Sequence, residues 1–314
     1  MPDAPPLPSP SEMAATYEAV KNWGRWERDK GALALLTSEH RVAAAALVRS
    51  GLTVSLAHDL ATEATAEIPH PVVHEMRASG ATRASVPIAG YEAARDHLAT
   101  DVHGMGLTHI DALCHMFVEG RMFDGLDAEL VTEHGAERNS IMAAADGVIG
   151  RGVLLDVPAS RGVGYLDPGS YVTVADLEAA EAAQGCTVRT GDMLVVSTGR
   201  DARRAAQGGV LDPLSDGLAG LHPECLAWLR DRSIALLGSD GISDRLPAGP
   251  IESWPFPIHQ VAITGMGLLL VDNLRLDDVL AACADHGRWE FLLTIAPLRL
   301  PGGTGSPVNP IAIF

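Results

Sequence analysis

The chain has 314 residues, of which 47% are hydrophobic and 20% are charged, and its formal net charge is −17 at pH 7. This length and composition support a sizeable buried core, and they exclude a disordered chain and a small disulfide-stapled domain. So acidic a chain also argues against nucleic-acid binding, because phosphates are bound by clustered lysine and arginine.

The start of the chain and the cysteines indicate the compartment. The opening MPDAPPLPSP is proline-rich and has neither the basic start nor the apolar stretch of a signal peptide. The cysteines lie far apart and form no CxxC pair: Cys114, Cys186, Cys225 and Cys283. Residues 261–271 are too few and too rich in glycine to span a bilayer. We therefore expect a cytoplasmic protein in a reducing environment.

The first third of the chain predicts a lead-in, a helix and a strand. Residues 1–20 are expected to be a flexible lead-in to a single domain over residues 21–314. Residues 38–51 combine a capping serine, small apolar residues at helical spacing and a final glycine, which predicts a helix. Residues 52–60 alternate between apolar and polar side chains and are predicted to form a strand.

Residues 61–83 are mixed in character and are expected to be loop-like. They contain His70 and His74, which have the i,i+4 spacing of metal ligands on a helix. Pro71 disfavours a helix there. We interpret this pair as a loop feature near the mouth of a pocket.

The rest of the chain alternates between apolar runs and helical patterns. Strands are predicted over residues 147–157, 191–199, 234–239, 261–271 and 289–300. Residues 172–185 are predicted to be the end of a strand, an aspartate-capped helix and a glycine stop, and helices are predicted over residues 222–233 and 276–287. This alternation predicts an α/β fold with a mixed sheet and helices packed outside it.

Three smaller features are weaker candidates for a functional site. The basic segment 199–209 is expected to be a solvated loop in so acidic a chain, and His222 to lie on the surface. Asp240 and Asp244 follow a buried strand, where binding sites are often built. Aspartate in a Gly/Ser turn is more often structural, so both readings stay open.

The apolar stretch GLTHIDALCHMF carries three side chains that can bind metal or transfer protons: His109, Asp111 and His115. Burying such groups without a partner is costly. His109 and Asp111 share one face of a strand, and Asp111 and His115 share one face of a helix. A strand that turns into a helix near Asp111 would bring all three together. Such N/O donors suit Zn²⁺, Mn²⁺ or Fe²⁺. The alternative is a pair of satisfied core histidines with Asp111 as a helix cap.

THIDALCH resembles the His-x-Asp-x-x-x-His signature of the metal-dependent cyclase-like hydrolases, the family that includes bacterial kynurenine formamidase and isatin hydrolase. Further similar stretches follow the order of that family from about residue 20 onward: NWGRW, GRGVLLDV, RTGDMLVVSTG, LLGSDGISD, PIHQ, LLLVDNLRLDDV and APLRLPGGTGSPV. The resemblance implies a swivelling β/β/α fold, a homodimer or homotetramer, and one or two divalent ions, zinc or manganese. It also implies hydrolysis of amide, lactam or related acyl bonds in small, often aromatic, molecules.

The resemblance also implies roles for single residues. His109 and Asp111 correspond to metal ligands, and His115 to a ligand of a second ion or a proton carrier. His259, in PIHQ, matches the downstream histidine at the metal centre, where it is a ligand or carries a proton. Asp272 stands where relatives usually have a glutamate ligand.

Two residues depart from the pattern of the formamidases. Met105 stands four residues before His109, where those enzymes have a histidine, and a thioether is a poor ligand for a hard divalent ion. Either this ligand position is empty or His103 replaces it. Asp272 is one methylene shorter than glutamate, which would weaken the binding of one of two ions.

The expected function is therefore hydrolysis of a small-molecule substrate by water that a metal ion activates. Two alternatives stay open. One is a metal-dependent cyclase, dehydratase or lyase that acts on a carbonyl substrate. The other is a non-catalytic member of the family that binds a ligand. No nucleic-acid or membrane partner is expected.

Overall fold

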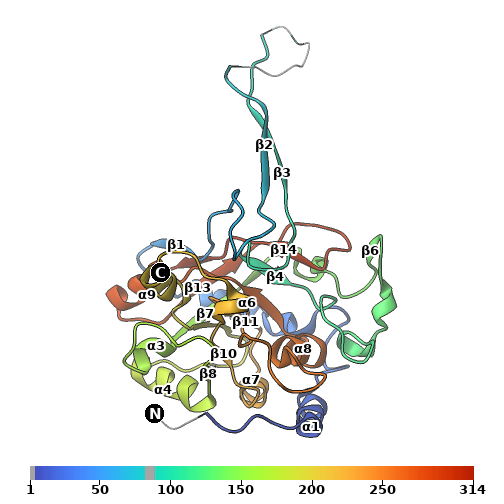
Figure 1. Ribbon diagram of the computed structural model, residues 1–314, viewed down its shortest axis with the longest axis vertical. Helices are drawn as coiled ribbons and strands as arrows, with labels where there is room; N and C mark the ends of the chain where they lie inside the picture. The colour runs from blue at the N-terminus through green and yellow to red at the C-terminus, as the bar shows by residue number, and fades with distance from the viewer. Residues whose placement is uncertain (1–3, 82–87, 89) are drawn as a thin grey trace.

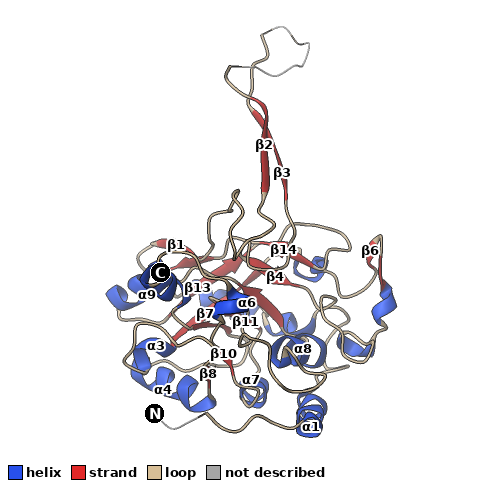
Figure 2. Ribbon diagram, viewed as in Figure 1, coloured by secondary structure: helices blue, strands red, loops and turns tan. Residues whose placement is uncertain are grey.

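The computed structural model describes residues 4–81, 88 and 90–314. Within them, nine strands form one mixed sheet surrounded by helices (Figures 1 and 2). In spatial order the strands are β1 (Thr53–Ser55), β15 (Ile311–Ile313), β13 (Glu290–Ile295), β7 (Val148–Asp156), β9 (Met193–Ser197), β11 (Leu236–Ser239), β12 (Leu269–Asp272), β4 (His109–Asp111) and β14 (Gly305–Pro307). The strands β7, β9, β11 and β12 run parallel, and antiparallel pairs flank them on both sides.

The remaining elements are helices and three small strand pairs. The helices are α1 (Pro10–Val20), α2 (Ser38–Ala45), α3 (Val157–Ser160), α4 (Val174–Gln184), α5 (Arg200–Ala206), α6 (Pro213–Asp216), α7 (Cys225–Arg232), α8 (Pro257–Val261) and α9 (Asp277–His286). Single turns of other helix types are η1 (Gly31–Leu35), η2 (Phe123–Gly125), η3 (Ala128–Leu130), η4 (Ile141–Ala144) and the π-helical η5 (Ala262–Met266). The pairs are β2 (Val73–Ala78) with β3 (Arg95–Ala99), β8 (Tyr171–Val172) with β10 (Gly220–Leu221), and β5 (Val131–Thr132) with β6 (Gly135–Ala136).

The central strands are built from apolar runs that are buried on both faces, as parallel strands require. All residues of β9 and β11 are buried, and so is most of β7. Helices α2 and α4 pack against β7, and α9 packs against β1. The predicted α/β class with a mixed sheet is confirmed, as are the strands over β7, β9, β11 and β13 and the helices over α2, α4, α7 and α9.

The strand predicted over residues 261–271 is wrong for most of its length. Only β12 forms a strand there, and residues 257–266 form α8 and η5. The helical segment ends at Gly267, which has φ of 69°, and a Cβ on this glycine would lie 2.4 Å from the ring of Phe123. Because α8 and η5 are buried on all sides, they lack the polar stripe that separates a helix from a strand in a sequence.

The structure also differs from the expected lead-in. Residues 10–20 form α1, which begins with a capping box between Ser9 and Glu12. The side chains of Met13, Tyr17 and Val20 lie on one face of α1 and are buried. Helix α1 therefore packs on the body of the protein, and the boundary predicted at residue 20 falls at the end of a packed helix.

The hairpin of β2 and β3 stands away from the body of the protein (Figure 1). The prediction that residues 61–83 are loop-like is wrong for residues 73–78, which form β2, and residues 82 and 83 are outside the described part of the chain. His74 is on β2 and pairs with Asp96 of β3 at 3.0 Å, whereas His70 lines two pockets at the base of the hairpin. In the described residues, no helix is both long enough and apolar enough to cross a membrane.

Candidate metal centre

The site begins with the two strands that carry its carboxylates. Strand β4 lies between β12 and β14 and places His109 and Asp111 on one face. Asp272, the last residue of β12, is paired in register with His109. Side chains of residues paired across two strands point to the same face. The three side chains therefore converge, and all three are buried.

His109 and His103 approach Asp111 from one side. Nδ1 of His109 donates to the carbonyl of Leu107 at 3.1 Å, which leaves Nε2 available 3.6 Å from Oδ1 of Asp111. Nδ1 of His103 lies 2.8 Å from the same oxygen, and its Nε2 lies 2.9 Å from Oγ1 of Thr304. Potential ligand atoms of His103, His109 and Asp111 all lie within 4.8 Å of one another.

His259 approaches the carboxylates from the other side. It is on α8, and its Nε2 lies 3.0 Å from Oδ2 of Asp272 and 3.5 Å from Oδ2 of Asp111. Its Nδ1 donates to Oδ2 of Asp244 at 2.7 Å. Asp111, His259 and Asp272 form a second group whose potential ligand atoms lie within 4.8 Å of one another. Asp111 belongs to both groups, as expected of a residue between two ions or at the middle of one centre.

His115 reaches the site by a different route from the one predicted. In the described chain, β4 is followed by a turn and not by a helix, and the N–H of His115 donates to the carbonyl of Ala112 at 3.0 Å. The His115 ring stacks on that of His103, with centroids 3.7 Å apart and planes at 10°. His115 lines the pocket beside the cluster but is in neither group of candidate ligands. Its predicted role as a ligand stays a prediction, and the geometry favours a proton carrier.

The charges of the cluster fit a divalent cation. Burial alone would raise the pKa of Asp111, but the hydrogen bond from His103 and the His259 imidazole 3.5 Å away lower this pKa well below its usual range. Burial alone would lower the pKa of His259, but Asp272, Asp111 and Asp244 around it raise that pKa well above 6.5. Among the described residues, Oδ2 of Asp111 and Oδ1 of Asp272 are buried without a hydrogen-bond partner. Unpaired oxygens in a buried, carboxylate-rich cluster are what a bound cation would satisfy.

The two alternatives for the missing histidine ligand differ in their geometry. Met105 lines a neighbouring pocket, whereas His103 reaches Asp111 directly. The geometry therefore favours His103 in place of the absent ligand, from a position two residues earlier in the loop. This assignment remains a prediction about coordination.

Two adjoining pockets give access to the cluster. The smaller, of about 200 Å³, is lined by the candidate ligands together with His115, Met116, Ile242 and Phe256. The larger, of about 370 Å³, is mostly apolar and includes Ile68, Met105, Leu214 and Leu246. His103, Gly104, Ile242 and Phe256 line both pockets. A small molecule with an apolar body could therefore place a polar group at the cluster.

Two predictions about residues outside the cluster are wrong. His222 is buried, and its ring lies edge-on to Tyr171 at 5.1 Å, so it is not a surface residue. The basic segment 199–209 contains α5, whose Arg200 and Arg203 are buried, so it is not a solvated loop. Both errors come from tertiary contacts. Tyr171 packs against the ring of His222, and segments outside α5 supply acceptors to Arg200 and Arg203.

Asp240 and Asp244 have separate roles. The carboxylate of Asp240 accepts hydrogen bonds from the N–H groups of residues 198–200 and holds the turn before α5. Asp244 instead contacts His259. Sequence reasoning left Asp244 between these two readings and did not identify Thr304, because nothing in the sequence indicates that they contact His259 and His103.

Three comparisons place the chain among known proteins. The model of the family described as "Putative cyclase" matches residues 51–244. Isatin hydrolase of Roseibium aggregatum is 29% identical over 150 residues, which are 47% of this chain and 54% of that protein. The match thus spans about half the length of this curated relative.

Solved structures extend the similarity over nearly the whole chain. A crystal structure of a novel cyclase has a TM-score of 0.83 at 29% identity, over 94% of this chain and 99% of the other. Isatin hydrolase A from Ralstonia solanacearum has a TM-score of 0.57 at 21% identity, over 88% and 97% of the two chains, which shows a shared fold. The predicted cyclase-like fold is confirmed. Because the family model covers more than half of its length, the chain belongs to the cyclase family.

Proposed function

We propose that the protein is a metal-dependent hydrolase that cleaves an amide, lactam or related acyl bond of a small molecule. The observation that carries the proposal is the buried cluster of His109, Asp111, His259 and Asp272, with two carboxylate oxygens that accept no hydrogen bond, beside a mostly apolar pocket. The relationship to isatin hydrolase over 150 residues supports a hydrolase in particular.

The residues around the centre have two proposed roles: most would bind the metal ion, and one would transfer a proton. Nε2 of His109, Nε2 of His259 and the carboxylates of Asp111 and Asp272 would hold a zinc or manganese ion, with His103 as a further ligand. Such an ion supplies a Lewis acid that polarises a carbonyl and lowers the pKa of bound water to about 7.

His115 is suited to proton transfer. Burial lowers its pKa to about 4, so the imidazole is neutral at pH 7 and can accept a proton. Its place in the pocket wall lets it pass this proton to the leaving nitrogen or oxygen of a bound substrate. Ile242 and Phe256 line both pockets, where they would pack on the substrate and exclude water. A homodimer or homotetramer is part of the proposal and rests on the family resemblance.

The test combines metal analysis with labelled water. We expect the parent protein to bind zinc or manganese in stoichiometric amount, and His109→Ala to lose both metal and hydrolysis of a panel of N-formyl anilines, lactams and lactones. His134→Ala is the matched control, because the side chain of His134 is 87% exposed. In H₂¹⁸O, hydrolysis places one solvent oxygen in the acid product.

Three results would contradict the proposal. One is a His109→Ala protein that hydrolyses the substrate at the parent rate. Another is a product without solvent oxygen, which would favour a metal-dependent cyclase, dehydratase or lyase. The third is the absence of metal binding by the parent, which would favour a non-catalytic ligand-binding protein.

A further inference from the structure

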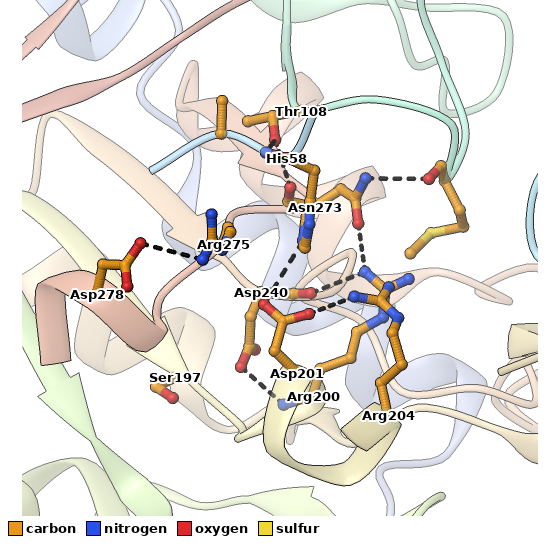
Figure 3. Close-up of polar contacts among 12 residues, drawn as sticks. His58, Thr108, Ser197, Arg200, Asp201, Arg204, Asp240, Asn273, Arg275 and Asp278 are labelled. Atoms are coloured by element: carbon orange, nitrogen blue, oxygen red, sulfur yellow. Dashed lines mark hydrogen bonds and ion pairs between the residues drawn. The ribbon is translucent and has the colours of Figure 1, made fainter. Parts of the chain in front are cut away.

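The backbone of Asn273 joins two segments that lead to the candidate metal centre. Asn273 directly follows Asp272 and is buried. Its N–H donates to the carbonyl of Gly241 at 2.7 Å. Its own carbonyl accepts a hydrogen bond from Oγ1 of Thr108 at 2.6 Å (Figure 3). Thr108 directly precedes His109, and Gly241 lies in the loop that ends at Asp244.

The side chain of Asn273 joins two more segments. Nδ2 donates to the carbonyl of Met105 at 3.0 Å. Oδ1 accepts from Nη1 of Arg200 (Figure 3). Met105 lies in the loop between His103 and His109. All four polar groups of Asn273, two in the backbone and two in the side chain, therefore form hydrogen bonds. Three of them contact segments that carry candidate ligands or Asp244, the partner of His259.

Arg200 sets the orientation of the Asn273 amide. A guanidinium group only donates, so the amide oxygen must face it and the amide nitrogen must face the carbonyl of Met105. Arg200 is itself buried, pairs with Glu67, and donates to the carbonyl of Asp240 at 3.0 Å. Because Arg200 is held from two sides, the Asn273 amide has one orientation.

The backbone conformation at position 273 limits which residue types can occupy it. Its φ is 57°, in the left-handed region that asparagine, aspartate and glycine tolerate better than other residues. Aspartate would keep the shape, this φ and the contact with Arg200. It would place an oxygen, in place of an N–H, 3.0 Å from the carbonyl oxygen of Met105.

We propose that Asn273 is a positioning residue for the metal centre, which sets the spacing between the loop of His103, the strand of His109 and the end of β12. This inference rests on the proposed function, because it needs a metal at the cluster. Asn273→Asp makes two acceptors repel each other, which displaces the loop of residues 103–106 and loosens the ligand set. Residues that orient ligands without binding the metal typically change its affinity by about 10–100-fold.

The chain offers a matched control in Asn22. Asn22 is also buried, its Nδ2 donates to the carbonyl of Met266 at 3.0 Å, and its Oδ1 accepts from Nη1 of Arg25 at 3.1 Å. Asn22→Asp is thus the same chemical change between the same kinds of partner, in a residue that makes none of the contacts of the candidate centre.

The experiment measures binding of Zn²⁺ by calorimetry to chelator-treated full-length protein, with the absorption spectrum of the Co²⁺-loaded protein as a second readout of ligand geometry. We expect Asn273→Asp to bind Zn²⁺ at least about tenfold more weakly and to change the Co²⁺ spectrum. Asn22→Asp should bind Zn²⁺ as the parent does. Thermal unfolding of the metal-free proteins shows whether the two variants fold alike.

A second pair of variants tests the inference if Asn273→Asp fails to fold. Thr108→Val removes the hydroxyl that donates to Asn273 and should weaken Zn²⁺ binding, whereas Thr108→Ser keeps the hydroxyl and should restore it. Parent-like Zn²⁺ binding by Asn273→Asp, or by Thr108→Val where Asn273→Asp does not fold, would overturn the inference, and so would an equal loss in Asn22→Asp. A parent protein that binds neither Zn²⁺ nor Mn²⁺ would overturn the proposed function and this inference with it.

Discussion

Nδ1 of His259 donates a hydrogen bond to Oδ2 of Asp244 at 2.7 Å, and Nε2 of the same ring faces Asp111 and Asp272. Asp244 also accepts from the backbone N–H of His259 at 3.0 Å, so one carboxylate holds both the ring and the first turn of α8. A carboxylate behind a histidine ligand fixes its tautomer and makes Nε2 more basic.

We predict that Asp244→Asn weakens Zn²⁺ binding by about 10–100-fold, because the amide no longer offers a charged acceptor to Nδ1 of His259. Calorimetric titration of chelator-treated protein measures this change. Asp176→Asn is the control, since Asp176 also accepts a backbone N–H, at Thr173, but lies on α4. Equal Zn²⁺ affinities of the parent and Asp244→Asn would show that Asp244 has no part in orienting the ligand.

A second prediction separates His115 from the candidate ligands. Its pKa is lowered to about 4 by burial, so it is neutral at pH 7 and suited to accept a proton. We expect His115→Ala to keep its metal and to lose about 10²–10⁴-fold in kcat. Metal content and steady-state kinetics are measured on the same preparation, with His134→Ala beside it. Loss of metal in His115→Ala would instead place His115 among the ligands.

His58 should make stability depend on pH. Burial lowers its pKa to about 4, and Arg204, Arg200 and Arg275 act in the same direction. Asp201, whose Oδ2 lies 3.6 Å from Nε2 of His58, does not reverse this shift. Between pH 4 and the unfolded-state pKa of about 6.5, the unfolded chain binds more protons, so the free energy of unfolding rises with pH. The contribution of His58 to the free energy of unfolding is therefore fully present above pH 6.5 and is lost as the pH falls towards 4.

The expected size of the effect follows from the two pKa values of His58. Between pH 7.5 and pH 5 the parent should lose about 2 kcal/mol more of its free energy of unfolding than His58→Gln does. Urea unfolding at both pH values gives the difference. His134→Gln should behave as the parent. If His58→Gln lost as much stability on acidification as the parent, the assignment would be wrong.

The packing of α1 can be tested by truncation. Removal of residues 1–20 takes away the buried side chains of Met13, Tyr17 and Val20. Each such side chain contributes about 1.5–3 kcal/mol when fully buried, so we expect a loss of several kcal/mol in the free energy of unfolding. Removal of residues 1–9 alone leaves these contacts in place and should cost much less. Equal stability of both shortened chains would mean that residues 10–20 are a lead-in after all.

Some parts of the fold are predictable because their signals are local. The glycine and cap residues around α4 predict a helix, and the apolar run of β7 predicts a buried strand, because each pattern lies within the element that it describes. The segment of α8 and η5 was not predictable in this way. Every residue in it is buried, so its hydrophobic pattern has no polar face to reveal the helical period.

By itself, the sequence determined the fold class and the position of the candidate centre, since THIDALCH is a contiguous motif whose donors and neighbours can be read directly. Only the tertiary structure decided that His103 faces Asp111 in place of Met105, that Asp244 orients His259, and that Asn273 joins the loops around them. These contacts form across strands and loops that meet only when the sheet assembles. The residues that make these contacts are far apart in the sequence, so no periodic or local sequence pattern indicates that they meet.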